Sequence, residues 1–147
     1  EINISSLVED CLHDYMIRFS QRKFLPDIRN ELYVNGDKML LQIAINNLLD
    51  NAIKYSPKES PICVEVNARE NILQIMVKDE GKGVEAHEKI KVFNKFYRVG
   101  NDATRKAKGT GLGLYLTKKI ILSHKGEIFI MDNKPHGSIF IIELKQV

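Results

Sequence analysis

Residues 46–55 read Asn46-Asn47-Leu48-Leu49-Asp50-Asn51-Ala52-Ile53-Lys54-Tyr55 and divide into two contrasting faces of one helix. At about 100° per residue, Asn47, Asp50, Asn51 and Lys54 share one face. The opposite face carries the apolar side chains Leu41, Ile45, Leu48, Leu49, Ala52 and Ile53. The pattern predicts a helix capped by Asp37 that packs on a sheet and ends near Tyr55, before Ser56-Pro57.

The polar face of this helix is unusual because it carries asparagines. Asparagine is a mediocre helix former, and a surface helix is more often built from Glu, Lys and Gln. Asn47 and Asn51 would present amide oxygens one turn apart, which suits a hard cation such as Mg²⁺. Taken alone, the stripe is more typical of a solvated helix face than of a metal site.

Hydrophobic periodicity extends the interpretation in both directions along the chain. Upstream it predicts a helix, capped by Asn3 or Ser5, and then a strand closed by Asn35-Gly36. Downstream it predicts a hairpin around Glu70-Asn71, a third helix and a final pair of strands. The predicted ranges are helix Ile2–Phe19, a strand through Ile28, Leu32 and Val34, strands Ile62–Ala68 and Ile72–Lys78, helix Leu114–Ser123, and strands Glu127–Met131 and Ser138–Leu144.

The order of these elements argues for the fold class. Strands arrive in consecutive hairpins and do not alternate with helices, which favours an α+β two-layer sandwich over a doubly wound parallel sheet. The length of 147 residues fits one domain with a real core. We expect a piece of a longer protein, because the chain begins with Glu1.

Composition excludes several classes of protein. Apolar residues make up 44% and charged residues 28%, as in an ordinary globular domain. The net charge of +3 is too small to argue for nucleic acid. No apolar run approaches the length of a membrane span. Cys11 and Cys63 form no CxxC pair, so we expect neither a disulfide framework nor a zinc site. We expect the protein to reside in a reducing compartment.

Two glycine clusters carry further chemistry. Asp79-Glu80-Gly81-Lys82-Gly83 places one carboxylate beside two glycines, where it could accept a hydrogen bond from an amino group such as that of adenine. A plain turn is the alternative. Gly109-Thr110-Gly111-Leu112-Gly113 opens directly onto a predicted helix, whose free amides suit a phosphate. It matches neither the Walker A pattern nor the dinucleotide fingerprint, and a hinge is the alternative.

The connection between the clusters, residues 79–113, is long for a compact domain, and such loops are usually functional. It holds an apolar island of Val92, Phe93, Phe96 and Tyr97. After the island, Val99–Lys108 is basic and almost free of apolar side chains. Beside a phosphate site, this segment is interpreted as a mobile lid.

In this order, the four segments resemble the catalytic and ATP-binding domain of bacterial sensor histidine kinases. Residues 47–55 resemble the N box, residues 79–83 the first glycine box, Phe93–Arg98 the F box and residues 109–114 the second glycine box. The opening Ile2–Leu7 and the closing Gly137–Leu144 are similar to the ends of that domain. The implied fold is the Bergerat sandwich, a mixed and mainly antiparallel sheet with helices on one face.

The resemblance implies a role for each site residue. Asn47 and Asn51 would hold the Mg²⁺ that bridges the phosphates of ATP. Lys54 would contact a phosphate, and Tyr55 would pack on the adenine. Asp79 would accept a hydrogen bond from the adenine amine. The catalytic set would be Asn47, Lys54 and Arg98. The other nucleotide-binding residues would be Gly81, Gly83, Phe96, Arg105, Gly109, Thr110, Gly111, Leu112 and Gly113.

The family's reaction moves the γ-phosphoryl group of ATP to a histidine on a separate helical hairpin. We expect residues 1–147 to be one kinase domain without that hairpin or a sensor region. His13-Asp14 begins like the acceptor motif but lacks its proline, so His13 is interpreted as an ordinary helix residue. The expected partners are the parent's hairpin and a response regulator, with no nucleic acid and no direct membrane contact. The isolated domain should be monomeric and cytoplasmic, its parent anchored in the inner membrane.

Three rivals stand beside this interpretation. ATPases like those of DNA gyrase, heat-shock chaperones and mismatch repair resemble the fold but carry a glutamate, the base for water, at the position of Asn47. Because an amide cannot take a proton from water, Asn47 favours transfer over hydrolysis. An anti-sigma-factor serine kinase would not normally show this F box and second glycine box. A degenerate binding module is the third rival, although every box is intact.

Overall fold

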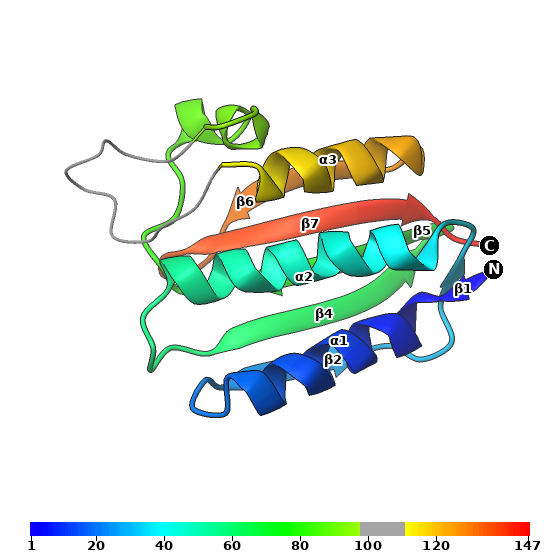
Figure 1. Ribbon diagram of the computed structural model, residues 1–147, viewed down its shortest axis with the longest axis horizontal. Helices are drawn as coiled ribbons and strands as arrows, with labels where there is room; N and C mark the ends of the chain where they lie inside the picture. The colour runs from blue at the N-terminus through cyan, green and yellow to red at the C-terminus, as the bar shows by residue number, and fades with distance from the viewer. Residues whose placement is uncertain (98–110) are drawn as a thin grey trace.

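The computed structural model describes residues 1–97 and 111–147, in which three α-helices lie on one face of a five-stranded sheet (Figure 1). In chain order the elements are β1 (Ile2–Asn3), α1 (Ile4–Arg18), β2 (Phe24–Ile28), β3 (Tyr33–Val34), α2 (Lys38–Tyr55), β4 (Ile62–Arg69), β5 (Ile72–Lys78), η1 (Ala86–Glu88), η2 (Lys91–Phe93), α3 (Gly113–Ser123), β6 (Glu127–Asp132) and β7 (Ser138–Lys145).

The sheet has the strand order β2-β4-β5-β7-β6. β2 runs parallel to β4, whereas the other neighbouring pairs are antiparallel. The predicted α+β sandwich, with a mixed and mainly antiparallel sheet and helices on one face, is therefore confirmed. Within the described residues, no helix is long and apolar enough to cross a membrane.

The core lies between the sheet and the helices. Alternate residues of β4 and β5, such as Val64 and Ile75, are buried, as expected for strands with one covered face. The predicted apolar face of α2 is buried from Leu41 to Ala52, while Ile53 is partly buried. Glu70 and Asn71 both have positive φ, the backbone of a tight hairpin turn.

The predicted strand through Ile28, Leu32 and Val34 is wrong. The chain instead forms β2, which ends at Ile28, and the two-residue strand β3, which pairs with β1 in a separate small sheet. β2 contains Pro26, which lacks the N–H of a normal strand residue. This proline is tolerated because β2 is an edge strand and has one side without a partner strand.

The two helix starts for which a cap is predicted, those of α1 and α2, are capped by side chains. The Asn3 side-chain oxygen accepts from the Ser6 amide at 3.0 Å, so Asn3 is the cap of α1, not Ser5. Asp37 accepts from the Leu40 amide at 3.1 Å and caps α2. Such caps are typically worth about 1 kcal/mol of stability.

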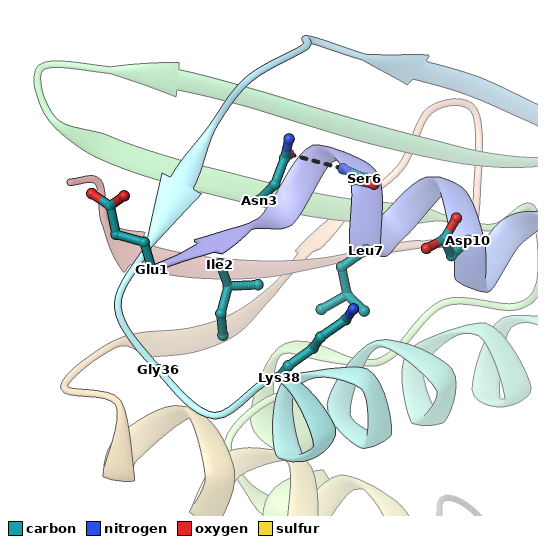
Figure 2. A pocket seen from close by; sticks show the side chains of 8 residues that line it. All are labelled: Glu1, Ile2, Asn3, Ser6, Leu7, Asp10, Gly36 and Lys38. Carbon is teal, nitrogen blue, oxygen red and sulfur yellow. Dashed lines mark hydrogen bonds between the residues drawn. The ribbon is translucent and has the colours of Figure 1, made fainter.

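A cavity of about 290 Å³ lies at the N-terminal end of α2, where Lys38 faces the start of the chain (Figure 2). Its lining consists of Glu1, Ile2, Asn3, Ser6, Leu7, Asp10, Gly36 and Lys38. None of these residues was predicted for the site. Tyr55 lies at the other end of α2, roughly 27 Å along the helix axis at 1.5 Å per residue.

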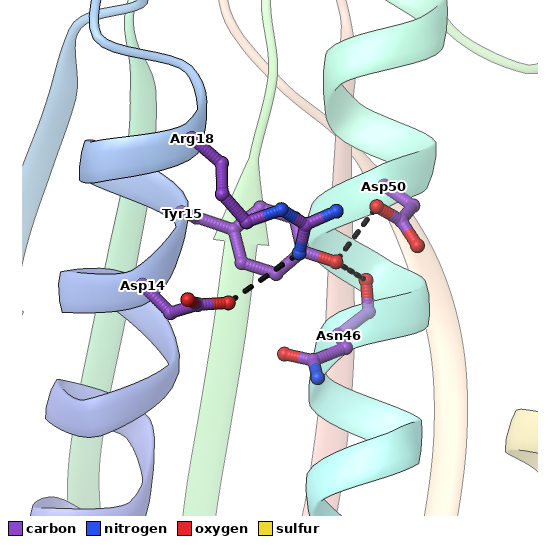
Figure 3. A network of polar contacts seen from close by, with 5 residues as sticks. All are labelled: Asp14, Tyr15, Arg18, Asn46 and Asp50. Carbon is purple, nitrogen blue, oxygen red and sulfur yellow. Dashed lines mark hydrogen bonds and ion pairs between the residues drawn. The ribbon is translucent and has the colours of Figure 1, made fainter.

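α1 is fixed to α2 by a polar contact that involves Asn46 and Asp50, the residues directly before Asn47 and Asn51 (Figure 3). The Tyr15 hydroxyl donates to the Asp50 carboxylate at 2.7 Å and lies 3.2 Å from the Asn46 carbonyl oxygen. Burial, together with this bond, raises the pKa of Tyr15 above its ordinary value. Asp50 therefore faces α1, although the helix pattern groups it with Asn47, Asn51 and Lys54.

Candidate nucleotide site

Asn47 is held in one orientation by α3. Its side-chain nitrogen donates to the Gly113 carbonyl oxygen and to the Thr117 hydroxyl oxygen, each at 3.2 Å. A carbonyl oxygen only accepts, so the NH₂ side of the Asn47 amide must face α3. The amide oxygen then points away from these two acceptors, and no other described residue bonds to it. The N box thus presents one oriented amide oxygen.

The rest of the N box is more open. Asn51 is partly buried, and its side chain has no hydrogen-bond partner among the described residues. Lys54 is exposed, and the Tyr55 side chain is 47% exposed. Arg22 fixes this end of α2 by donating to the Ile53 carbonyl at 3.2 Å and the Ser56 hydroxyl at 2.7 Å. Asn51, Lys54 and Tyr55 are therefore available to a ligand.

Asp79 is a buried carboxylate at the end of β5, only 3% exposed. Its Oδ1 accepts from the Gly81 amide at 2.9 Å and the Ser138 amide at 3.3 Å. Oδ2 has no such partner within the described residues. Burial raises the pKa of Asp79, while the two amides and the charge of His136 act against that rise. A fixed hydrogen-bond acceptor in a low-dielectric site is suited to recognising an amino group.

The first glycine box is packed against the end of the N box. A Cβ on Gly81 would collide with the Tyr55 carbonyl oxygen. Gly83 has φ +81° and lies against the backbone of Gly137. The resemblance implies that Gly81 and Gly83 leave room for the adenine base. Gly81 is required by the close approach of two backbone segments, whatever ligand binds.

The second glycine box is joined to the F box and to α3. Gly111 has φ +73°, and its carbonyl accepts from the Phe96 amide at 3.0 Å. Phe96 itself has φ +65° and is 63% exposed. Leu112 is the N-cap of α3 without a side-chain cap bond, and Gly113 is the first helical residue. Within the described residues, no side chain caps the start of α3, which leaves first-turn amides open to an acceptor.

These contacts connect the predicted segments. The N box touches the first glycine box through Tyr55 and Gly81, and the second through Asn47 and Gly113. The second glycine box touches the F box through Gly111 and Phe96. The predicted site residues Arg98, Arg105, Gly109 and Thr110, and the predicted lid Val99–Lys108, lie outside the described residues. Their assigned roles stay predictions.

Gly81 and Gly113 should respond differently to alanine. We expect Gly81→Ala to lower the free energy of unfolding by about 1–3 kcal/mol, because two backbone segments must move apart. A Cβ on Gly113 would have Asn47 as its nearest neighbour at 3.9 Å, so Gly113→Ala should keep or slightly raise stability. Urea unfolding of both variants checks this, and equal losses would contradict it. Loss of ATP affinity in a stable Gly113→Ala variant would place the nucleotide against Gly113.

The described residues constrain what metal this site could hold. They contain no group of three or more His, Cys, Asp or Glu side chains arranged for a metal. Amide oxygens from Asn47 and Asn51 are the ligands available here. Mg²⁺ takes few protein ligands and completes its shell with water and phosphate oxygens, so this sparse oxygen set fits it and does not fit zinc.

A family model described as histidine kinase-, DNA gyrase B-, and HSP90-like ATPase matches residues 36–147. The chain belongs to this family. Its relatives within the family include sensor histidine kinases, which confirms the recognised type of domain. The sensor histidine kinase WalK of Bacillus subtilis is 42% identical over 122 residues, which are 82% of this chain and 20% of WalK.

Other sensor proteins match over similar ranges. The sensor protein CiaH of Streptococcus pneumoniae is 39% identical over 108 residues, 74% of this chain and 24% of CiaH. The sensor-like histidine kinase SenX3 of Mycolicibacterium smegmatis is 31% identical over 147 residues, 99% of this chain and 38% of SenX3. The chain thus spans about a quarter of the length of CiaH and about a fifth of WalK.

Solved structures agree with the histidine kinase type of the domain. The mycobacterial sensor histidine kinase MprB aligns with a TM-score of 0.86 at 27% identity, covering 99% of this chain and 95% of that one. The catalytic domain of histidine kinase ThkA aligns with a TM-score of 0.82 at 26% identity, covering 98% and 95%. The Bergerat sandwich expected from the resemblance is therefore the fold observed.

Two features of the site were missed by sequence reasoning. One is the 132–138 turn behind Asp79, where Asn133 donates to the Asp79 carbonyl at 2.8 Å and His136 donates to the Gly81 carbonyl at 3.0 Å. The pairing of β7 with β5 brings this turn next to Asp79, and no local motif predicts that placement. The other is Thr117, a hydroxyl four residues after Gly113. The sequence offered one signal for Thr117, which is a polar residue on the apolar face of a predicted helix.

Proposed function

We propose that this domain binds Mg-ATP and donates the γ-phosphoryl group to a histidine on a separate phosphoacceptor helical hairpin. It would serve as the kinase module of a two-component signalling system. The observation that carries the proposal is the pair Asn47 and Asn51, one turn apart, with the Asn47 amide oriented by Gly113 and Thr117. The relatives named sensor histidine kinases support it.

In this proposal, each described residue performs one physical task. Asp79 accepts from the adenine amine, and the exposed Tyr55 ring packs on the base. Lys54 meets a phosphate, while the amide oxygens of Asn47 and Asn51 hold Mg²⁺. Bound Mg²⁺ would supply positive charge against the phosphate oxygens. Phosphoryl transfer needs mostly positioning and charge stabilisation, which is what fixed side chains of these types provide.

Arg98 and Arg105 would add positive charge near the terminal phosphate, and Gly109 and Thr110 would line the nucleotide. In the transfer, a nitrogen of the acceptor histidine bonds to the γ-phosphorus, the bond from that phosphorus to the bridging oxygen breaks, and ADP leaves. We place the domain in the cytoplasm, with its parent anchored in the inner membrane. The partners would be the parent's hairpin and then a response regulator.

Hydrolysis of ATP by water is the second candidate, because the matched family description includes ATPases. Hydrolysis needs a base for water, and the Asn47 amide cannot take up that proton. Asp50 lies on the same helix, but it accepts the Tyr15 hydroxyl at 2.7 Å on the side of α1. Transfer to a histidine, which brings its own nucleophilic nitrogen, needs no such base.

Asn51→Ala tests the metal assignment. Loss of one amide ligand should cost about 1–3 kcal/mol of Mg-ATP binding, which is roughly a 5- to 150-fold rise in Kd. The fold should be intact, because the described residues give the Asn51 side chain no hydrogen bond. Calorimetric titration with ATP, in Mg²⁺ and in EDTA, measures the effect.

Gln42→Ala is the matched control for Asn51→Ala. Gln42 is an exposed amide on the same helix, outside the N box, and its loss should leave both Kd values unchanged. An Asn51→Ala variant with wild-type affinity for Mg-ATP would overturn the assignment of Asn51 to the metal.

A further inference from the structure

Thr117 is a polar side chain with 0% exposure, one turn into α3 and among apolar residues such as Ile120 and Ile121. Its hydroxyl donates to the Gly113 carbonyl at 2.8 Å and accepts from the Asn47 side-chain nitrogen at 3.2 Å. Asn47 also donates to the same Gly113 carbonyl. The three groups form a closed triangle between α2 and α3.

The triangle has a defined direction. A threonine hydroxyl has one proton, and this one is directed at Gly113, so its oxygen can only accept from Asn47. If the Asn47 amide turned over, its oxygen would face the Gly113 carbonyl oxygen and the lone pairs of Thr117. The contact with the carbonyl oxygen would be repulsive, and Thr117 could donate to the turned amide only by giving up its own bond to Gly113. Thr117 therefore adds a second constraint that keeps the Asn47 oxygen away from the Gly113 carbonyl oxygen and the Thr117 hydroxyl.

Packing does not explain the hydroxyl. Valine has almost the same shape, and a buried hydroxyl is costly unless it is hydrogen-bonded. Bonding to the carbonyl four residues earlier is common for threonine in helices and accounts for the Gly113 contact. It does not account for the contact with Asn47 on a different helix. The hydrogen bond between Thr117 and Asn47 therefore needs a separate explanation.

We propose that Thr117 is a positioning residue that orients the Asn47 amide oxygen toward the metal of the bound nucleotide. This inference rests on the proposed function, in which Asn47 holds Mg²⁺. Thr117 acts through Asn47 and itself contacts neither metal nor nucleotide. In Thr117→Val, a methyl group would stand 3.2 Å from the Asn47 nitrogen, closer than an ordinary van der Waals contact, so the amide must shift or turn.

The test measures how ATP binding depends on Mg²⁺ in wild type, Thr117→Val and Thr117→Ser. We expect Thr117→Val to raise the Mg²⁺ concentration for half-maximal ATP binding by about three- to tenfold, the effect of one hydrogen bond. Its affinity for ATP in EDTA and its melting temperature should stay at or above wild type. Thr117→Ser keeps the hydroxyl and should restore the Mg²⁺ dependence. Ser123→Ala, which removes a hydroxyl bonded to Ile120 on the same helix, should change nothing.

A readout without nucleotide separates this inference from the proposed function. The side-chain NH₂ signals of Asn47 in ¹⁵N NMR spectra can be assigned with Asn47→Asp. They should shift or broaden in Thr117→Val and stay at their wild-type positions in Thr117→Ser. A Thr117→Val protein with unchanged NH₂ signals and an unchanged Mg²⁺ dependence would overturn the role of Thr117 alone. Wild-type ATP binding that does not respond to Mg²⁺ would overturn the metal assignment of Asn47, and this inference with it.

Discussion

ADP should bind the wild-type domain on the order of 100-fold more tightly than GDP. The Asp79 carboxylate is buried and held by the Gly81 and Ser138 amides, so it cannot turn away from an unsuitable base. Adenine presents an amine to this acceptor, whereas guanine presents a carbonyl oxygen. A buried charged acceptor facing another acceptor costs about 3 kcal/mol, which corresponds to that factor.

Asp79→Asn should reverse the preference. The asparagine oxygen can still accept from Gly81 and Ser138, so the fold is retained. The NH₂ group then replaces Oδ2 and can donate to the guanine carbonyl but not accept from adenine. Calorimetry with ADP and GDP on both proteins measures the change. Asp27→Asn, at an exposed carboxylate of β2, is the matched control and should alter neither affinity. Equal binding of ADP and GDP by wild type would remove Asp79 from base recognition.

The pH dependence of ADP binding gives a second readout of the same carboxylate. Burial raises the pKa of Asp79, so the group takes up its proton at a higher pH than an ordinary aspartate. Protonation replaces the acceptor with a donor, so ADP affinity should fall as pH falls through this raised pKa. Folding stability moves the other way, because Asp79 stabilises the folded state below its unfolded pKa and loses that contribution as pH rises through the folded pKa. Asp79→Asn should lack both changes.

Local patterns were sufficient for most of the fold. α2, the β4–β5 hairpin and α3 have clear periodicity and clear ends, and each formed within a residue or two of its predicted bounds. β1 and β3 were not predictable in this way, because two residues cannot show a period. They are strands only because Ile2 and Val34 meet across the small sheet. β2 was missed for a different reason: it contains Pro26, which only an edge strand tolerates, and edge position is a property of the whole sheet.

The candidate site, too, could be predicted from local patterns only in part. Helical geometry places Asn47 and Asn51 on the same side of α2, because spacing along one helix is fixed by 3.6 residues per turn. It could not separate Asp50, whose direction is settled by Tyr15 from another helix. Nor could spacing distinguish Gly81, which a neighbouring backbone requires, from Gly113, beside which there is space. Partners distant in sequence decide such questions.

Incubated with γ-labelled ATP, the 147-residue chain alone should neither label itself nor hydrolyse ATP at an appreciable rate. Hydrolysis should be slow because the Asn47 amide cannot take a proton from water. General-base assistance is typically worth roughly 10²–10⁴-fold, so turnover should be lower than that of an ATPase with a carboxylate base by about this factor. Self-labelling should fail because none of the four histidines lies in an acceptor motif.

Supplying the parent's hairpin as a separate polypeptide should restore phosphoryl transfer to its histidine. The rate should be low, because the covalent linker that normally raises the effective concentration of the hairpin is missing. Acid treatment identifies the product, since phosphohistidine is lost in acid while phosphoserine survives. A hairpin with its histidine changed to glutamine is the control and should take up no label. Acid-stable label on the isolated domain would instead support a serine kinase, and fast turnover without the hairpin would support an ATPase. Either outcome would mean that the oriented amide of Asn47 serves a different reaction from the one proposed.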